Sequence, residues 1–472
     1  MPANRLPSRK SRSDRMTKTK APRTAADLKA YVEQSSLPYA KVGVFDIDGV
    51  LRGKYMTRDK LLSSLEKGFG FCDVVLGWDC RDQLLDNLTM TGWHTAYPDA
   101  EARLLPETTR FIPFEDNMPL VLGEFTGHME PVCPRSLLRR ILERAKAMGF
   151  AVKSSAEFEF FVFDETPHSV REKHYRNLTN ITPGDFGYSV IRNTVHADFY
   201  HDLLKLCLDM DMEIEGLHTE TGPGVLEAAI KFDDAMPSAD KAALFKTMTK
   251  VLAQKRGWMA TFMAKWSNDW PGQSGHLHMS LVDEKSGKPV FYDVAKPLGM
   301  SDTMRWFVGG QQALMPELLS MIACTVNSYT RLIPGAWAPT SASWGYENRT
   351  CALRVIGGSP KTQRVEYRIA AADINPYIAF AASIGSGLWG IENRIEPTKP
   401  VAGNAYAEKF PAKLALPTTL WEAAQRLKAS KPARALFGDK FVDHYAATRE
   451  WEEREARKAI TDWQLARYFE II

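Results

Sequence analysis

Three segments of the chain place ionisable side chains at every second position, with apolar side chains between them. In SSAEFEFFVFD, Glu157 and Glu159 alternate with Phe158 and Phe160. GHLHMSL and QRVEYRI repeat the pattern, and their ionisable residues are His276, His278, Arg364, Glu366 and Arg368. Because alternate side chains of a strand point to opposite faces, each segment predicts a strand whose apolar face packs on a core. One such strand is ordinary on a half-exposed sheet, but three together predict a cavity lined with ionisable groups.

A fourth segment, HTETGPGVLE, adds Glu220 and Glu227 around a Gly-Pro-Gly turn. Clustered carboxylates repel one another unless a cation neutralises them, and oxygen donors with a single imidazole suit Mg²⁺ or Mn²⁺. A basic set lies in the C-terminal half of the chain: Arg331, Arg349, Arg354, Lys361, Arg364 and Arg368. Carboxylates for metals and arginines for an anion are typical of phosphoryl transfer. Neither GxxxxGKS nor GxxxxGKT occurs, which excludes a P-loop enzyme.

The positive charge of the chain is concentrated at its start. Residues 1–24 carry eight Lys or Arg and one acid, a net charge of +7, which leaves −4 for residues 25–472 out of a total of +3. The segment is rich in Pro, Ser and Thr and has no apolar run, so we expect a disordered basic tail. A nucleic-acid-binding arm is the alternative interpretation of this tail, but we expect no nucleic-acid partner because the rest of the chain is mildly acidic.

Hydropathy and cysteine spacing predict the compartment. We expect no membrane partner, since neither an apolar stretch of membrane-spanning length nor a secretory signal occurs. The six cysteines are scattered, without a CxxC pair. This spacing favours reduced thiols over a zinc site or a disulfide framework, and therefore predicts a cytoplasmic protein.

Helix and strand signals alternate along the chain, which predicts an α+β fold. KVGVFDI, the turn signal Asp48-Gly49 and VLRGKYM predict a hairpin. The two prolines of GHMEPVCPRS, followed by a helix start at Ser136, predict a boundary between a small β-rich domain (residues 25–130) and a larger domain (residues 131–472). Helices are expected over residues 25–34, 58–67, 137–150, 197–212, 239–255, 302–315 and 375–392, and within 420–472.

Six separated motifs occur in one order: AEFEFF, HTETGPGVLE, GHLHMSL, NSYTRLIPGAWAP, NRTCALRV and RVEYRIAAADINPY. In these motifs the sequence resembles the glutamine synthetase superfamily, over nearly the whole chain after the tail. The resemblance implies a small N-terminal β-grasp-like domain and a large catalytic domain whose antiparallel sheet forms a funnel-shaped site. It also implies a homo-oligomer of stacked rings, a dodecamer or similar, in which the N-terminal domain of one subunit completes the site of its neighbour.

The resemblance also implies roles for individual residues. It assigns two or three Mg²⁺ or Mn²⁺ ions, with Glu159, Glu220 and Glu227 on the glutamate side and Glu157, His276 and Glu366 on the ATP side. The residues that match the nucleotide side are His278, Ser280, Arg354, Lys361 and Arg364. Those that match contacts to glutamate or to the transferring phosphoryl group are Gly272, Arg331, Arg349 and Arg368.

The sequence departs from the family pattern where the nucleophile binds. In ordinary glutamine synthetases the NSYxRL segment continues into a flap whose acidic residue closes over the ammonium site, whereas LIPGAWAP places Trp337 there. In the segment GFGFCDVVLGWD, Asp73 is the nearest counterpart of an ammonium-binding aspartate, and Asp79 is a rival. Ammonium favours carboxylates, whereas an organic amine brings apolar surface that an indole can cover. A packing role is the alternative for Trp337.

These features predict a γ-glutamyl amine ligase. ATP would convert the γ-carboxylate of L-glutamate into γ-glutamyl phosphate, and a primary amine would displace phosphate to give a γ-glutamylamide. We assign Asp73 as the residue that accepts the proton from the amine. Three alternatives stay open: a glutamine synthetase that uses ammonium, a guanidino kinase, and a non-catalytic structural relative. A non-catalytic relative would be expected to have lost metal-ligating residues, yet all six matching residues are present.

Overall fold

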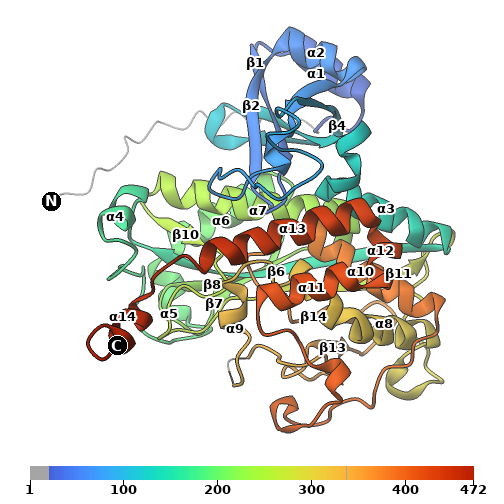
Figure 1. Ribbon diagram of the computed structural model, residues 1–472. Helices are drawn as coiled ribbons and strands as arrows, with labels where there is room; N and C mark the ends of the chain where they lie inside the picture. The colour runs from blue at the N-terminus through green and yellow to red at the C-terminus, as the bar shows by residue number, and fades with distance from the viewer. Residues whose placement is uncertain (1–20, 336) are drawn as a thin grey trace.

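The computed structural model describes residues 21–335 and 337–472, so most of the expected tail lies outside the described residues. A five-stranded and a nine-stranded sheet organise the molecule, and helices surround them (Figure 1). The small sheet lies at the blue, N-terminal end, and the large sheet lies within the rest of the molecule. Within the described residues, no helix combines the length and the apolar character needed to cross a membrane.

The five-stranded sheet has the order β2-β1-β5-β4-β3, with β1 and β5 parallel and the other neighbours antiparallel. Its strands are β1 (Tyr39–Phe45), β2 (Leu51–Thr57), β3 (Phe69–Cys72), β4 (Asp99–Ile112) and β5 (Met118–Phe125). The expected hairpin joins β1 to β2. Asp46 accepts the N–H groups of Asp48 and Val50 in its turn, and Gly49 takes the positive φ of 77° that the turn requires.

The nine-stranded sheet has the order β12-β13-β14-β11-β6-β8-β7, and β9 and β10 also pair with β6. Its strands are β6 (Phe150–Phe163), β7 (Ile214–Thr219), β8 (Val225–Ile230), β9 (Asp233–Asp234), β10 (Met259–Thr261), β11 (Gly275–Asp283), β12 (Trp344–Tyr346), β13 (Leu353–Ile356) and β14 (Arg364–Tyr367). All pairs are antiparallel except β12 with β13. This edge pair differs from the antiparallel expectation, because the chain crosses back along the sheet edge between β12 and β13. In the connecting loop, the Asn348 side-chain oxygen accepts hydrogen bonds from the Thr350 N–H and hydroxyl.

The α-helices are α1 (Ala25–Gln34), α2 (Arg58–Lys67), α3 (Pro134–Ala147), α4 (Pro167–Glu172), α5 (Val190–Val195), α6 (Ala197–Asp209), α7 (Ala235–Lys255), α8 (Asp302–Leu318), α9 (Ser328–Arg331), α10 (Pro376–Glu392), α11 (Leu420–Ala429), α12 (Lys431–Phe437), α13 (Asp439–Ala456) and α14 (Asp462–Tyr468). Short 3₁₀ helices are η1 (Asp73–Leu76), η2 (Pro113–Glu115), η3 (Gly127–Val132), η4 (Pro297–Gly299), η5 (Leu319–Met321), η6 (Ala405–Ala407) and η7 (Ala412–Leu414). The predictions for α1 and α2 are confirmed residue for residue.

Two features near the chain start differ from the expected tail. Arg23 donates hydrogen bonds to the Glu107 carbonyl at 2.6 Å and to Asp211 at 3.0 Å. Thr24 caps α1, because its hydroxyl accepts from the Asp27 N–H. The structured part of the chain therefore includes the last residues of the segment expected to be disordered.

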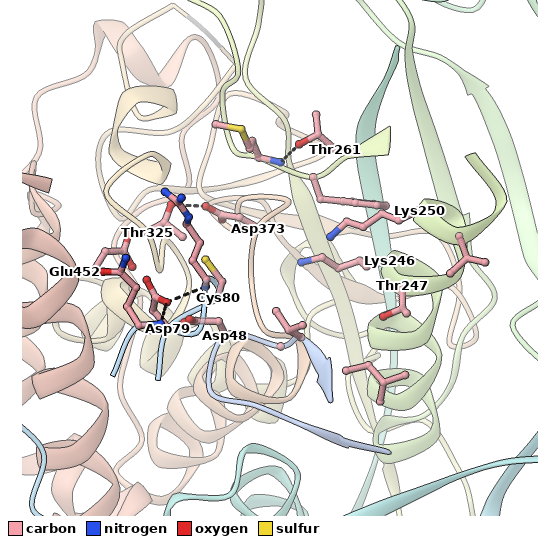
Figure 2. A pocket seen from close by; sticks show the side chains of 18 of the residues that line it. Asp48, Asp79, Cys80, Lys246, Thr247, Lys250, Thr261, Thr325, Asp373 and Glu452 are labelled. Carbon is pink, nitrogen blue, oxygen red and sulfur yellow. Dashed lines mark hydrogen bonds between the residues drawn. The ribbon is translucent and has the colours of Figure 1, made fainter. Parts of the chain in front are cut away.

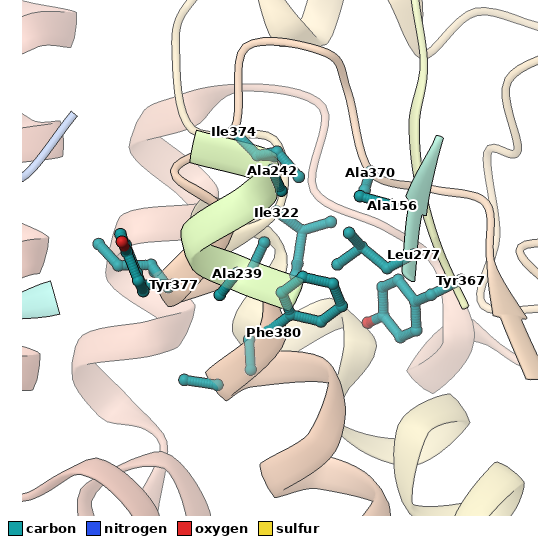
Figure 3. Packing of buried hydrophobic residues seen from close by; sticks show 14 of the residues in the cluster. Ala156, Ala239, Ala242, Leu277, Ile322, Tyr367, Ala370, Ile374, Tyr377 and Phe380 are labelled. Atoms are coloured by element: carbon teal, nitrogen blue, oxygen red, sulfur yellow. The ribbon is translucent and has the colours of Figure 1, made fainter. Parts of the chain in front are cut away.

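The main core lies between the large sheet and helices α7 and α10. Phe158, Leu277 and Tyr367, one from each of three neighbouring strands, are fully buried on this side of the sheet. Figure 3 shows Leu277 and Tyr367 next to Phe380 of α10, with Ala239 of α7 close by. Burying a large apolar side chain stabilises a fold by about 1.5–3 kcal/mol, so this side of the sheet holds the strands in place.

Helices α8 and α10 approach each other through glycines. A Cβ atom on Gly310 would lie 2.5 Å from the Cα of Gly390, and one on Gly387 would lie 2.2 Å from the ring of Phe307. Such contacts leave no room for any side chain. The two helices therefore pack backbone to backbone behind the sheet. Because α10 also packs against α3 and α7, it is buried and apolar on nearly all sides.

A buried charge network joins the small sheet to the larger part of the molecule. Arg135 of α3 donates to Glu124 of β5 at 3.0 Å and, through two nitrogens, to Asp240 of α7 at 3.0 and 3.1 Å. The Tyr377 hydroxyl donates to Asp240 at 2.7 Å. All four side chains are buried, so each charge depends on its partner for stabilisation.

We therefore expect Arg135→Gln to lower the free energy of unfolding by about 3–5 kcal/mol, because the buried Asp240 carboxylate loses its ion-pair partner, whereas Glu124 keeps Arg103 and Arg139. The matched control is Arg305→Gln, which removes a more exposed arginine that pairs with Glu396, and it should cost less than about 1 kcal/mol. Chemical denaturation followed by circular dichroism measures both. Equal costs for the two variants would contradict the importance of the buried network.

Candidate active site

The three alternating strands lie next to one another at the centre of the large sheet. β11 pairs with β6 on one side and with β14 on the other. The register places His276 opposite Glu157 and His278 opposite Glu366. Because the residues between them are buried on the opposite face, the ionisable rows form one continuous surface. The prediction that these rows meet is thus confirmed.

One group of side chains on this surface could hold a metal ion. Glu157, His276 and Glu366 each offer a ligand atom, and these atoms lie within 4.8 Å of one another. His276 Nδ1 lies 3.3 Å from a Glu366 oxygen and 3.7 Å from a Glu157 oxygen. Two carboxylates and an imidazole fit Mg²⁺ or Mn²⁺.

A second group lies on β7, on β8 and in the turn between them. His218, Glu220 and Glu227 also place ligand atoms within 4.8 Å of one another. Glu159 of β6 is the cross-strand partner of Glu227, and it accepts the Ser274 N–H at 2.7 Å. The structure therefore brings the three predicted carboxylates to one place and adds His218, which the sequence reasoning missed.

His218 had a signal in the sequence. It lies two residues before Glu220 in HTETGPGVLE, the spacing that puts two side chains on the same face of a strand. Tyr188, also missed, stacks on His218 with ring centroids 4.3 Å apart. It lies near Glu220 and Glu227, whose charges contribute after burial to raising the pKa of Tyr188.

The two groups differ in how their charge is balanced. Burial opposes ionisation of Glu366, but His276 and Arg368 outweigh it and lower the pKa of Glu366 to about 2. Burial, followed by the charges of Glu159 and Glu157, raises the pKa of Glu227 to about 9. The second group therefore lacks a compensating cation among the described residues, and its donor set fits a divalent ion.

Basic side chains surround the first group. Arg368 forms an ion pair with Glu366, and Arg354 donates to the other Glu366 oxygen at 3.0 Å. Arg364 donates to His278 Nδ1 at 3.3 Å. Arg354 and Arg368 therefore lie against the metal-ligand candidate Glu366, and such a group of cations suits a polyanion.

Arg331 and Gly272 are brought together below this surface. Arg331 is buried and donates to the Ile369 carbonyl at 3.1 Å. Burial lowers its pKa to about 10, although Glu159 opposes the shift. A Cβ atom on Gly272 would lie 2.7 Å from the Arg331 side chain, so any residue other than glycine at this position would displace Arg331. Arg349 is exposed, and its backbone carbonyl accepts a hydrogen bond from Arg368 at 3.1 Å.

A cavity of about 470 Å³ opens beside the first group. Four of the five residues predicted for the nucleotide line it: His278, Ser280, Lys361 and Arg364. Glu157 lines the same cavity, so a nucleotide there would lie next to a candidate metal site. Arg354, the fifth residue, reaches the site through Glu366.

Asp73 and Trp337 are not brought to these groups by the described chain. Asp73 lies in η1 beside the small sheet, fully buried, and neither of its carboxylate oxygens has a hydrogen-bond partner among the described residues. Burial raises its pKa, with Thr91 and His128 opposing. Trp337 is 66% exposed in a loop and has a φ of 55°. A bulky residue rarely adopts this left-handed conformation, so the surrounding loop must hold the backbone of Trp337 in it.

Comparisons with known proteins agree with this geometry. The glutamine synthetase catalytic domain matches residues 131–468. Type-1 glutamine synthetase 2 from Dictyostelium discoideum is 44% identical, over 93% of this chain and 85% of that protein. A glutamate–isopropylamine ligase from Pseudomonas sp. is 36% identical, over 94% of this chain and 97% of that protein. A gamma-glutamylethanolamide synthetase from Streptomyces coelicolor is 35% identical, over 94% and 95%.

The fold is shared with a solved protein as well. The structure of apo GmaS superimposes with a TM-score of 0.81 at 24% identity and covers 94% of this chain and all of that one. The resemblance to the γ-glutamylamide synthetase branch is confirmed, because two of these relatives carry glutamate–amine ligase names. The chain therefore belongs to the glutamine synthetase family.

Proposed function

We propose that this protein uses ATP to join the γ-carboxylate of L-glutamate to a primary amine, which gives a γ-glutamylamide, ADP and phosphate. The observation that carries the proposal is the pair of metal-donor groups on one sheet face, one of them bounded by arginines. A carboxylate is a poor electrophile, so an amide can form only after its oxygen has been converted into a leaving group. Phosphoryl transfer from ATP supplies that conversion.

The two donor groups divide the work between the substrates. We assign Glu157, His276 and Glu366 to the metal beside ATP, because the nucleotide-sized cavity adjoins them. We assign Glu159, Glu220 and Glu227 to the metal or metals beside glutamate, with His218 at their edge. When bound, Mg²⁺ or Mn²⁺ would neutralise charge on the phosphates and on the glutamate carboxylate.

The basic residues would hold the anions in line. His278, Ser280, Lys361 and Arg364 contact the nucleotide side in our proposal, with Arg354 fixed between Glu347 and Glu366. Arg331, kept in place by Gly272, and Arg368 would bind glutamate. The exposed Arg349 would then approach the transferring phosphoryl group. A γ-carboxylate oxygen attacks the terminal phosphorus, and ADP leaves.

The second step needs an amine and a base. We propose that Trp337 covers the carbon chain of the amine, and that the Asp73 carboxylate of a neighbouring subunit accepts its proton as nitrogen attacks and phosphate leaves. Two unpaired, buried carboxylate oxygens are consistent with a base that awaits a partner. A ring of subunits, each completing the next site, would supply that arrangement. The size of this ring stays a prediction, and so does the cytoplasmic location of the protein.

A second candidate function is glutamine synthesis from ammonium. The 44% identical relative carries a glutamine synthetase name, whereas the relatives at 36% and 35% carry amine-ligase names. The family alone therefore leaves the nucleophile open. The exposed indole of Trp337 favours an organic amine, because a bare ammonium ion offers no apolar surface to it.

The metal assignment predicts the behaviour of single variants. Glu227→Gln should weaken Mn²⁺ binding at least about tenfold, because one carboxylate ligand is lost, and electron paramagnetic resonance of free Mn²⁺ measures this. Glu392→Gln, which alters a surface carboxylate paired with Arg144, is the control and should bind Mn²⁺ as the wild type does. Unchanged Mn²⁺ binding by Glu227→Gln would remove that carboxylate from the metal site.

The nucleophile is decided by an amine panel. ADP release should be measured with glutamate, ATP and Mg²⁺, and with ammonium, methylamine, isopropylamine, ethanolamine, aniline or putrescine as the amine. We expect an organic amine to give a kcat/KM at least about tenfold above that of ammonium, the discrimination that burial of a few carbon atoms provides.

The highest kcat/KM for ammonium would instead establish a glutamine synthetase. Trp337→Glu is the matched variant for the amine pocket, and it should lower kcat/KM for the best organic amine more than for ammonium. If both values stay at their wild-type level, Trp337 lies outside the pocket.

Sites shared between subunits predict complementation. Asp73→Asn and Glu366→Gln should each inactivate the enzyme when expressed alone. Co-expressed with different tags and purified as mixed oligomers, they should recover roughly a quarter of the wild-type rate, since random pairing leaves roughly a quarter of the sites intact. Mixed oligomers as inactive as either parent would place Asp73 and Glu366 of a single subunit in the same site.

A further inference from the structure

A second, larger cavity lies away from the proposed active site. It measures about 990 Å³ and is bounded by α7, the β1–β2 turn, the 79–83 loop and α13 (Figure 2). Asp79, the rival of Asp73 in the sequence analysis, lines it, but none of the residues assigned under the proposed function does. Lys246 lies 5.5 Å from the ring of Phe158, which points to the face of β6 opposite Glu157. The cavity is therefore behind the sheet.

One wall of this cavity carries two lysines, and neither forms an ion pair among the described residues. Lys246 and Lys250 lie one turn apart on α7, and Figure 2 shows both amino groups directed into the cavity. Lys246 donates to the Ile374 carbonyl at 2.7 Å, and Lys250 has no hydrogen bond or ion pair among the described residues. Like charges four residues apart on a helix repel each other, so an anion bound at this wall would reduce their repulsion.

The protonation of the two lysines supports this interpretation. Burial and the neighbouring Lys250 lower the pKa of Lys246 to about 7. Solvent reaches Lys250 through the cavity, yet the surrounding walls still lower its pKa. The Asp373 carboxylate, which also lines the cavity, opposes the shift at Lys246. A bound carboxylate would add the opposite charge that Lys250 lacks.

The facing wall is acidic. Asp48, Asp79 and Glu452 gather around the Cys80 thiol, and after burial their charges contribute to raising its pKa to about 11. Arg449 pairs with Asp48 and lies 3.5 Å from Glu452. Asp79 accepts two backbone N–H groups through one oxygen, at 2.8 Å each, and forms no ion pair within the described chain.

The lysines and the acids form no ion pair with each other across the cavity in the described residues. The apolar side chains of Leu51, Val251 and Phe262 also line the cavity. Phe262 is the ring beneath both lysines, at 5.8 Å from Lys246 and 5.6 Å from Lys250. The cavity therefore offers cationic donors at one side, an unpaired carboxylate at the other and apolar contact between them.

We propose that this cavity is a second binding site, which takes a zwitterionic metabolite with a carboxylate at one end, a primary ammonium group at the other and a short carbon chain between. Lys246 and Lys250 bind the carboxylate, Asp79 receives the ammonium group, and Phe262 covers the chain. A plain anion would leave Asp79 unmatched, and a plain amine would leave the lysines unmatched. The proposal gives Asp79 a role in this cavity in place of the ammonium-binding role for which it was the rival of Asp73.

Isothermal titration calorimetry on the full-length protein tests this, with ε-aminocaproate as the probe and caproate and hexylamine as matched single-charge compounds. We expect one ε-aminocaproate per chain and, for caproate, at least about tenfold weaker binding, because one charged contact is lost. Hexylamine can also bind in the proposed amine pocket of the active site. Binding there would not change in Lys250→Gln, and this separates it from binding in the second cavity.

Two variants and one control complete the test. Lys250→Gln and Asp79→Asn should each weaken ε-aminocaproate binding at least about tenfold. Asp79→Asn keeps a carbonyl oxygen for the loop N–H groups, so the loop stays intact, and thermal melting of each variant checks its fold. Lys288→Gln, at an exposed lysine far along the chain from α7, should bind as the wild type does.

Three results would overturn the proposal: no binding of ε-aminocaproate to the wild type, equal affinity for caproate, or wild-type affinity in both Lys250→Gln and Asp79→Asn. A crystal of the complex provides a direct control on position. Density for the probe between α7 and the 79–83 loop is the expected result, and density only beside Glu157 would contradict it.

Discussion

Mutual repulsion between carboxylates on one face of the large sheet is the constraint on which the rest of the structure depends. Glu159 and Glu227 face each other across neighbouring strands, and burial, followed by the charges of Glu159 and Glu157, raises the pKa of Glu227. The opposite face compensates for this repulsion. Phe158 and Ala228, the fully buried neighbours of these glutamates, hold the same two strands on the core, so the charged face cannot turn away or slip in register.

The two donor groups answer this repulsion in different ways. Around Glu366 the chain supplies its own cations, Arg354 and Arg368, and the carboxylate stays ionised. Around Glu227 the described chain supplies no comparable cation. An ion added at the second group would therefore relieve more repulsion than one added at the first. This asymmetry suits a reaction in which arginines bind the phosphates at the first donor group and a metal ion neutralises the carboxylate substrate at the second.

Local patterns in the sequence predict the strands and their charged faces because strand periodicity is a property of neighbouring residues. Elements that depend on distant contacts were out of reach. The ion pair of Arg135 with Asp240 joins residues 105 positions apart, and the cavity behind the sheet needs α7 and the β1–β2 turn together. His218 was within reach of the same periodicity but was masked by the carboxylates beside it.

The central claim is that the charged face activates a carboxylate by phosphoryl transfer before an amine attacks it. Glutamate carrying heavy oxygen isotope in its γ-carboxylate tests this most directly, with phosphorus NMR of the phosphate released during amide formation. The account predicts that each phosphate carries one labelled oxygen from glutamate, because that oxygen bridges carbon and phosphorus in γ-glutamyl phosphate. Released phosphate without label, at a normal rate of amide formation, would contradict it.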